Sequence, residues 1–478
     1  MTPLVDHRRL PTLPCGSRAE PTNNTSSTHA LISSQTSIHL LLGAGMRHSM
    51  SSISRRRLTR TPRSFFASPC YKTRRPLSIS PYEHIDDVER LDFYRPGGYH
   101  PIEIGERLRD RYTVVYKLGF GSYSTIWLAR DEELARYVAI KVGVADHGSK
   151  EVDILSQLSA RAIENVHPGG GLIPIILDRF DLDGPNGTHP CSVTAPARCN
   201  MAEVLEAGSG PFQLRVARSL AAQLAMAVAY VHHMGYVHGG EYLYPVLLVI
   251  TGSNAAPLST GVPPRVYPPI WLGKPGHEVT LPEAKLVLAD FGTAFCPARE
   301  SRFESYTPLQ TRPPEARFEP TTPLSYASDI WSLGCVIWGI LGVRPFLDNW
   351  LFGPDDATAD QVDALGPMPE DWWEAWEGRS KRFRENGKPK EGRELWTFEQ
   401  RFHDAIQEPR RRRGLEAMGD AERDALFEMI RGMLVFKPGG RLSAEEVLRS
   451  DWMRTYAIPE AEKTCGDDLS STNRRSVV

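Results

Sequence analysis

Alternating apolar and polar residues mark the first regular part of the chain, which begins near residue 112. Residues 112–118 and the run from Thr125 to Arg130 both alternate with a period of two, so each is predicted to be a strand. An apolar run over residues 137–142 and a strand-like stretch over residues 180–195 follow. These patterns predict a small β-rich unit over about residues 112–195.

Helical periodicity dominates the rest of the chain. Ile154, Leu155 and Leu158 fall on one face of a helix that interrupts the strands. An amphipathic run from Pro211 to Met234 predicts a long helix that leads directly into His238. A strongly apolar helix is predicted after residue 328. Its apolar positions are Val336, Ile337, Trp338, Ile340 and Leu341.

The predicted elements indicate an α+β fold with two lobes. Near its end, Ser443 stands three residues before Glu446, the spacing of a capping box that starts a helix. The expected bounds are 1–82 for an N-terminal segment, 83–111 for a turn-rich lead-in, 112–456 for the domain (N-lobe about 112–195, C-lobe about 196–456), about 251–285 and 349–410 for two inserts, and 457–478 for a C-terminal tail.

The N-terminal segment differs in composition from the domain. Residues 1–82 are rich in Ser, Thr, Pro and Arg and show no sustained period, so we expect them to be disordered. Residues 46–80 contain nine Lys or Arg residues and no acidic residue. That composition suits a mitochondrial presequence, but it also suits an ordinary basic tail that is open to phosphorylation. Met46 and Met50 are alternative starts of the protein.

The overall composition excludes several classes of protein. Lys and Arg total 56 against 58 Asp and Glu, so direct nucleic-acid binding is not indicated. Seven cysteines without a Cys-x-x-Cys pair indicate no disulfide framework or zinc site and suit a reducing compartment. No apolar run reaches the ~18 residues of a membrane span. We expect an intracellular monomer without a transmembrane segment, in the cytoplasm or nucleus, with the mitochondrion as the alternative.

A glycine-rich stretch joins the first two predicted strands and reads Gly119-Phe120-Gly121-Ser122-Tyr123-Ser124. Glycines at such a turn let backbone N–H groups approach phosphate oxygens where a Cβ would clash. Alone this is weak evidence, because ordinary turns supply many Gly-x-Gly sequences. Lys141 would meet the phosphates, and Glu151 on the following helix would hold its ammonium. A solvated lysine at the end of a strand is the alternative for Lys141.

Three acidic residues and one arginine downstream are further candidates. Residues 286–289 are apolar and predict a strand that ends at Asp290, a candidate ligand of a metal that bridges phosphates. An aspartate in an ordinary β-turn is the alternative for Asp290. Glu315 and Arg441 are candidates for a buried, bidentate ion pair. Asp329 lies in the first turn of the strongly apolar helix.

In this order and spacing the motifs resemble those of the eukaryotic protein kinase superfamily. More narrowly, the chain resembles the serine/arginine-rich protein kinases (SR-protein kinases), especially divergent fungal ones. The likeness covers about residues 92–456 and is carried by residues 94–101, 117–129, 261–273 and 289–295. It implies a bilobal protein kinase fold, ATP and Mg²⁺ as co-substrates, phosphorylation of serine in Arg/Ser-rich proteins, and an activation segment that needs no phosphorylation.

The resemblance also implies roles for individual residues. Asp290 would bind Mg²⁺, and Glu315, Asp329 and Arg441 would be structural. The residues expected to bind ATP are Leu118, Gly119, Gly121, Ser124, Ile126, Ala139, Lys141 and Glu151.

The expected catalytic loop departs from the family pattern. His238 is present, but Gly240 replaces the aspartate that orients the attacking hydroxyl, and Pro245 replaces the asparagine that holds a second magnesium. Glycine has no side chain, and the proline ring offers a metal no oxygen. Glu241 adjoins the missing aspartate, but neighbouring residues in such a loop point in different directions. Residues 240–245 are either a genuine, degenerate catalytic loop or an error in the gene model, in which a misplaced splice site displaced an Asp-Leu-Tyr-Pro-like loop.

Three functions compete. The first is an ATP-binding serine/threonine kinase whose phosphoryl transfer is weak or lost. The second is an inactive pseudokinase that binds partners through the insert at 251–285 and the tryptophans within residues 372–376, although buried packing would also explain those tryptophans. The third, a small-molecule phosphotransferase, is disfavoured because Glu315, Asp329 and Arg441 match kinases that act on proteins.

Overall fold

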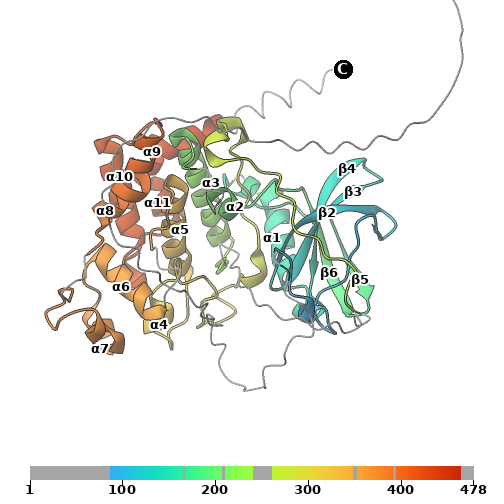
Figure 1. The fold of residues 1–478 in the computed structure, drawn as a ribbon, viewed down its shortest axis with the longest axis horizontal. Helices are drawn as coiled ribbons and strands as arrows, with labels where there is room; N and C mark the ends of the chain where they lie inside the picture. The colour runs from blue at the N-terminus through green and yellow to red at the C-terminus, as the bar shows by residue number, and fades with distance from the viewer. Residues whose placement is uncertain are drawn as a thin grey trace, which may run out of the picture. The chain divides into compact units, whose positions relative to one another are not determined.

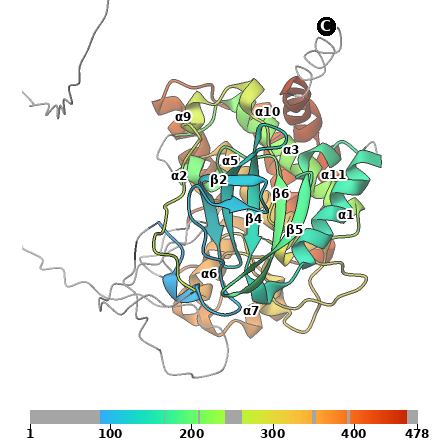
Figure 2. The same cartoon turned by 90° about the vertical axis from the view of Figure 1, so that its right-hand side faces the viewer.

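The first part of the described chain is an antiparallel β-sheet. The computed structural model describes residue 85 and residues 87–164, 167–206, 210–240, 261–347, 353–390 and 395–464. The sheet has the strand order β1-β2-β3-β4-β6-β5. Its strands are β1 (Arg107–Leu108), β2 (Tyr112–Gly121), β3 (Ser124–Asp131), β4 (Arg136–Gly143), β5 (Asp178–Gly184) and β6 (Gly187–Thr194). Figure 2 shows the sheet facing the viewer with helix α1 (Lys150–Glu164) beside it.

The second part is helical. In Figure 1 its helices lie together on one side, and the sheet with α1 lies on the other. The chain thus combines a sheet region and a larger helical region, as the predicted α+β class requires. The helices after α1 are α2 (Met201–Glu206), α3 (Leu214–His233), α4 (Glu315–Phe318), α5 (Tyr326–Leu341), α6 (Pro354–Leu365), α7 (Glu370–Ala375), α8 (Phe398–Phe402), α9 (Glu408–Arg412), α10 (Asp420–Met433) and α11 (Ala444–Arg449).

Strand alternation gives the sheet two different faces. Val138, Ile140 and Val142 of β4 are buried in one apolar cluster with Trp127 of β3. Since successive side chains of a strand point to opposite faces, the other residues of β4, Lys141 among them, lie on the opposite face. One face of the sheet therefore packs in the apolar cluster of the sheet itself, and the opposite face carries Lys141.

Helices α3 and α5 form the centre of the main core. Tyr230 of α3 and Trp331 and Trp338 of α5 are fully buried there. Among the described residues, α3 is the one helix long and apolar enough to cross a membrane, but 83% of its apolar window is buried inside the protein. We therefore assign α3 as the core helix that its sequence pattern predicts.

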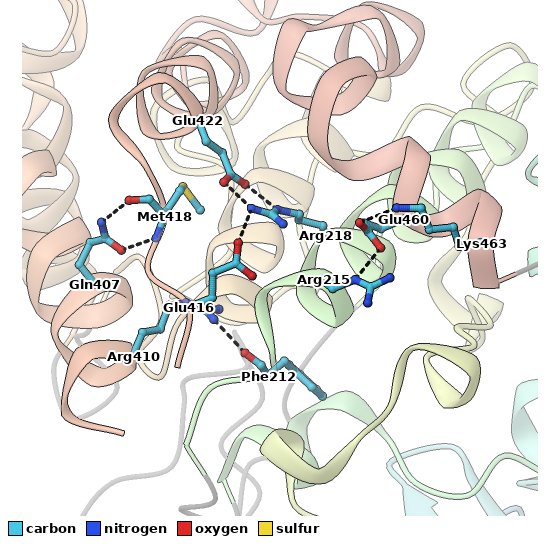
Figure 3. A network of polar contacts seen from close by, with 10 residues as sticks. All are labelled: Phe212, Arg215, Arg218, Gln407, Arg410, Glu416, Met418, Glu422, Glu460 and Lys463. Carbon is cyan, nitrogen blue, oxygen red and sulfur yellow. Dashed lines mark hydrogen bonds and ion pairs between the residues drawn. The ribbon is translucent and has the colours of Figure 1, made fainter. Parts of the chain in front are cut away.

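A network of arginines and glutamates fixes the start of α3 (Figure 3). Arg218 makes two hydrogen bonds to Glu422 of α10, at 2.6 and 2.8 Å, and Arg215 bonds Glu460 at 3.2 Å. Fully buried Arg410 donates to two backbone carbonyls at 2.7 and 2.9 Å, and burial lowers its pKa to about 10. These contacts hold the start of α3 against the last helices, and so they set the direction in which α3 approaches the candidate site.

Regular structure continues beyond residues 112 and 456, the bounds predicted for the domain. Strand β1 and the buried side chain of Tyr94 precede residue 112 and belong to the sheet region. At the other end, helical structure continues through Thr464, and Ala457 lies in the main core. The bounds at residues 112 and 456 stay a prediction, and regular structure extends past both of them. The lead-in has no clear period, and small alanines gave the last helix no strong apolar pattern.

The described residues of both predicted inserts contact other parts of the chain. In the first, Asn186 of the β5–β6 turn donates to the carbonyl of Gly261 at 2.8 Å, and the N–H of Ile270 donates to the carbonyl of Lys117 on β2 at 2.9 Å. In the second, α8 contributes Phe398 and its neighbours to the main core. The predicted disordered segment, residues 1–82, lies outside the described residues.

Candidate functional site

The register of the sheet places the glycine-rich stretch beside Lys141. Gly119 of β2 pairs with Ile126 of β3, and Ile126 pairs with Lys141 of β4. These positions form one row across three strands, each about 4.8 Å from the next. The hairpin closes with Gly121 opposite Ser124. The two predicted strands therefore join at the glycine-rich turn, and the lysine lies in the neighbouring strand.

Lys141 lies between two carboxylates. Its Nζ is 2.5 Å from Glu151 Oε1 on α1, the partner that the sequence predicted, and 2.9 Å from Asp290 Oδ1. Asp153, the other acidic residue nearby on α1, instead pairs with Arg179 on β5 at 3.3 Å. One ammonium thus links the sheet, α1 and the segment that follows residue 285.

The positive charge of Lys141 and the negative charges of Glu151 and Asp290 stabilise one another. Burial works against the ammonium of Lys141, but its pKa is raised because Asp290 and Glu151 both attract its charge. The charge of Lys141 in turn lowers the pKa of Asp290. Asp290 therefore stays ionised at neutral pH. Its side chain remains exposed to solvent, where a cation or a ligand could reach it.

Open space lies beside the glycine hairpin. A Cβ built at Gly119 or at Gly121 would have no protein atom within 4 Å. Side chains at these positions would occupy that space, whereas glycines leave it open to a ligand that approaches the backbone. With Lys141 on the adjacent strand, the space fits a phosphate chain, and Asp290 offers the carboxylate that Mg²⁺ takes in combination with phosphate oxygens.

The other residues expected to contact ATP lie around the same row. Ser124 and Ala139 are buried, whereas Leu118 and Ile126 are half-buried. Ala139 stands two residues before Lys141 on β4, so both lie on the same face of the sheet. Leu118 falls at an irregularity in the β2–β3 register. The sheet thus brings all four residues to the glycine hairpin and its neighbouring strand.

Asp329 holds the chain that follows α3. This buried residue of α5 accepts hydrogen bonds from the backbone N–H groups of His238 at 2.7 Å and Gly239 at 2.9 Å. Burial opposes the negative charge of Asp329, but the pKa is lowered because the hydrogen bonds from His232, at 3.0 Å, and from Gly239, together with the attraction of nearby histidines, outweigh it. The position of the expected catalytic loop is therefore fixed up to Gly239.

The backbone at Gly240 is adapted to glycine. The ring of His238 is fully buried, and its Nε2 lies 3.0 Å from the carbonyl of Ala289. The N–H of Gly240 donates to Nδ1 of the same ring at 3.3 Å. A Cβ at Gly240 would lie only 2.9 Å from Cε1 of His238, so an aspartate would require a shift. Pro245 and Glu241 lie outside the described residues.

The strand predicted before Asp290 is absent among the described residues. Residues 286–289 form no ladder, because their polar groups bond elsewhere. The N–H of Leu286 donates to the Gln223 side chain at 2.9 Å, and that of Leu288 donates to the carbonyl of Leu172 at 2.8 Å. A short apolar run marks a buried extended segment as readily as a strand, so periodicity could not separate the two.

Glu315 and Arg441 form the predicted buried pair. Two hydrogen bonds join the side chains, at 2.6 and 2.8 Å, and both residues are buried. Arg441 also donates to the carbonyls of Val435, Ala327 and Phe436 at 2.7 to 2.8 Å. The pair therefore connects α4 with the segment before α11.

Arg302 is a residue that the sequence did not reveal. Its guanidinium donates to the carbonyl of Thr293, pairs with Glu300 at 3.0 Å and lies 4.6 Å from the ring centre of Phe295. Arg302 therefore orders the segment after Asp290 with contacts internal to that segment. No spacing rule distinguishes such an arginine from one on the surface.

Known proteins with sequences similar to this chain are named serine/threonine protein kinases. No family model matches the chain. A serine/threonine protein kinase of Aspergillus fumigatus is 27% identical over 77% of this chain and 90% of its own length. A serine/threonine-protein kinase named SRPK from Physarum polycephalum is 25% identical over 76% of this chain and 91% of its own.

Shorter matches point the same way. Protein kinase dsk1 of Schizosaccharomyces pombe is 36% identical over 31% of this chain and 29% of its own length. SRSF protein kinase 3 of Homo sapiens is 39% identical over 23% of this chain and 20% of its own. The resemblance inferred from the motifs is confirmed: the chain is a homologue of serine/threonine protein kinases, including the SR-protein kinase group.

Proposed function

We propose that this protein binds ATP with Mg²⁺ in the site formed by the glycine hairpin, Lys141 and Asp290. The sheet region would then be the small lobe of a protein kinase fold, and the helical region its large lobe. The observation that carries the proposal is the ion cluster, because Lys141 contacts both Glu151 and Asp290 beside a glycine hairpin with open space. When bound, Mg²⁺ neutralises phosphate charge.

The phosphate acceptor is proposed to be serine in Arg/Ser-rich proteins. The names of the relatives support a protein substrate, and one of them is an SRSF protein kinase. The buried Glu315–Arg441 pair also counts against a small-molecule phosphotransferase. Arg302 supports an activation segment that is ordered without an added phosphate, because its contacts to Glu300 and Thr293 lie within that segment.

We propose further that phosphoryl transfer is weak or lost. Position 240 has no side chain to orient a hydroxyl, and position 245 has no oxygen for a second metal. The nucleotide-facing residues are retained, so ATP binding and transfer are expected to be separable. A purely partner-binding pseudokinase gains no support from the tryptophans, since Trp372 and Trp376 are buried in one cluster with Phe383.

Binding of Mg-ATP should raise the thermal unfolding midpoint of the protein. A ligand at 100 times its Kd stabilises the folded state by about 2.7 kcal/mol, which a thermal-shift titration resolves. The variant Lys141→Ala should lose the shift, because it removes the ammonium that lies between both carboxylates.

Lys463→Ala is the matched control, since Lys463 is half-exposed on the last helix and pairs with nearby Glu460. It should keep the full shift. Absence of a shift in the unaltered protein, or an equal shift in Lys141→Ala, would overturn the proposed site.

A further inference from the structure

The lead-in segment contacts the glycine hairpin directly. The hydroxyl of Tyr99 donates a hydrogen bond to the carbonyl oxygen of Gly121 at 2.7 Å, although 22 positions separate the two residues. Gly121 itself is exposed at the end of β2, whereas only 4% of Tyr99 is exposed. A buried side chain from outside the predicted domain thus bonds the turn that faces the open space.

Tyr99 is held firmly enough to act as an anchor. Its ring packs against Phe93 and Tyr94, with centroid distances of 6.0 and 5.4 Å. Its backbone is fixed as well, because its N–H donates to the carbonyl of Phe93 at 3.0 Å and its own carbonyl accepts from Asn186 at 2.7 Å. With Tyr94, Val144 and Val262 it forms a small buried cluster. The hydroxyl therefore has little freedom to follow a moving hairpin.

The same cluster also fixes the tip of the hairpin. The N–H of Val144 donates to the carbonyl of Tyr123 at 2.9 Å, and the ring of Tyr123 stacks on His147 at 4.4 Å. Under the hairpin, the buried ammonium of Lys117 pairs with Glu89 of the lead-in. The hairpin is thus bonded at its base, at Gly121 and at its tip, and two of these bonds come from the lead-in.

The bond at Gly121 has a specific geometric effect. In a trans peptide the C=O and the following N–H point in opposite directions. Turning the carbonyl of Gly121 toward Tyr99 therefore turns the N–H of Ser122 away from Tyr99. In a glycine-rich phosphate loop these backbone N–H groups are the ones that meet phosphate oxygens. The orientation of this peptide is then set before any ligand arrives.

We infer that Tyr99 is a positioning residue. It orients the glycine hairpin so that the backbone N–H groups of residues 122–124 face the phosphates of the nucleotide. The inference rests on the proposed function for its ligand, but the anchor itself is a property of the protein alone. Tyr99 is buried and is not proposed to contact the nucleotide. It acts through Gly121, and its contribution is the orientation of one peptide.

Two measurements on Tyr99→Phe test the inference. Amide hydrogen exchange of the ligand-free protein should become faster in residues 119–124, because the hydroxyl is lost while the ring is kept. Mg-ATP should bind about 2- to 12-fold more weakly, the range that corresponds to one hydrogen bond. Adenosine has no phosphates, so its affinity should not change.

Tyr112→Phe is the matched control, because it removes a hydroxyl that donates to Asp178 at 2.8 Å on the same sheet, away from the hairpin. It should leave exchange at 119–124 and the ATP affinity unchanged. Unchanged exchange in Tyr99→Phe, or the same acceleration in both variants, would overturn the inference. If the unaltered protein binds no ATP, the proposed function fails, and faster exchange in Tyr99→Phe alone still supports the anchor.

Discussion

Phosphate transfer to an Arg/Ser-rich peptide is expected to be close to background for the protein as it stands. Loss of a positioned base costs about 10²- to 10⁴-fold in rate. Gly240 has no carboxylate to align the hydroxyl, and Pro245 cannot bind the metal that offsets charge on the transferred group. A radiolabelled transfer assay at saturating Mg-ATP measures this directly.

Restoring both residues should raise the rate well above either single change. Gly240→Asp must move the His238 ring, with or without the second change, because its Cβ would lie 2.9 Å from Cε1 of a ring that is fully buried. Alone, it also restores no ligand for the second metal. Pro245→Asn alone supplies a metal ligand but no residue that orients the hydroxyl. The double variant supplies both, and Asp290→Ala in that background is the control that should return the rate to background. Strong transfer by the unaltered protein, lost on Asp290→Ala, would refute this view, and Glu241 would be the next residue to test.

The Glu315–Arg441 pair should show the largest effect on stability. Breaking a buried ion pair by removing one partner costs about 3–5 kcal/mol, because it leaves a buried charge uncompensated. Arg441→Met should cost more than Glu315→Gln, since Arg441 also serves three backbone carbonyls. Urea unfolding of both single variants and of the double variant Glu315→Gln/Arg441→Met measures the coupling. The charge-swapped variant Glu315→Arg/Arg441→Glu tests whether stability is recovered.

The swapped variant should recover only part of the loss, because a glutamate at position 441 cannot donate to those carbonyls. Arg423→Met is the control: its pair with Asp420 is largely exposed, and such pairs are worth about 0–1 kcal/mol. Strictly additive losses in the Glu315 and Arg441 variants would show that the two charges do not stabilise each other.

Short-range sequence patterns were enough to predict several elements of the fold. The period-two runs gave β2 and β3, and the apolar face of Ile154 and Leu158 gave α1, because each element buries one side. The pairing of Lys141 with Glu151 also followed, since a strand and the next helix fix both positions. All of these patterns involve residues that are close in the chain, so a single sequence is enough to reveal them.

Other contacts depend on partners that are distant in the chain. Tyr99 reaches Gly121 only because Asn186 and Val262 complete the cluster around it. Residues 286–289 bond to Gln223 and Leu172, so the apolar run never becomes a strand. The local sequence does not show which backbone groups will form hydrogen bonds with residues distant in the chain. These contacts can be identified only from the folded structure.

Hydrogen bonds hold the described chain at Gly239 and at Gly261, on either side of residues 241–260. Asp329 fixes the backbone at Gly239, and Asn186 fixes it at Gly261. Closing a loop between fixed ends costs only about 0.6 kcal/mol more for each doubling of its length. A change in chain length between these anchors should therefore cost little through loop closure itself. A sequence change confined to this interval would alter the proposed transfer step and leave Lys141 and Asp290, which lie outside it, unchanged.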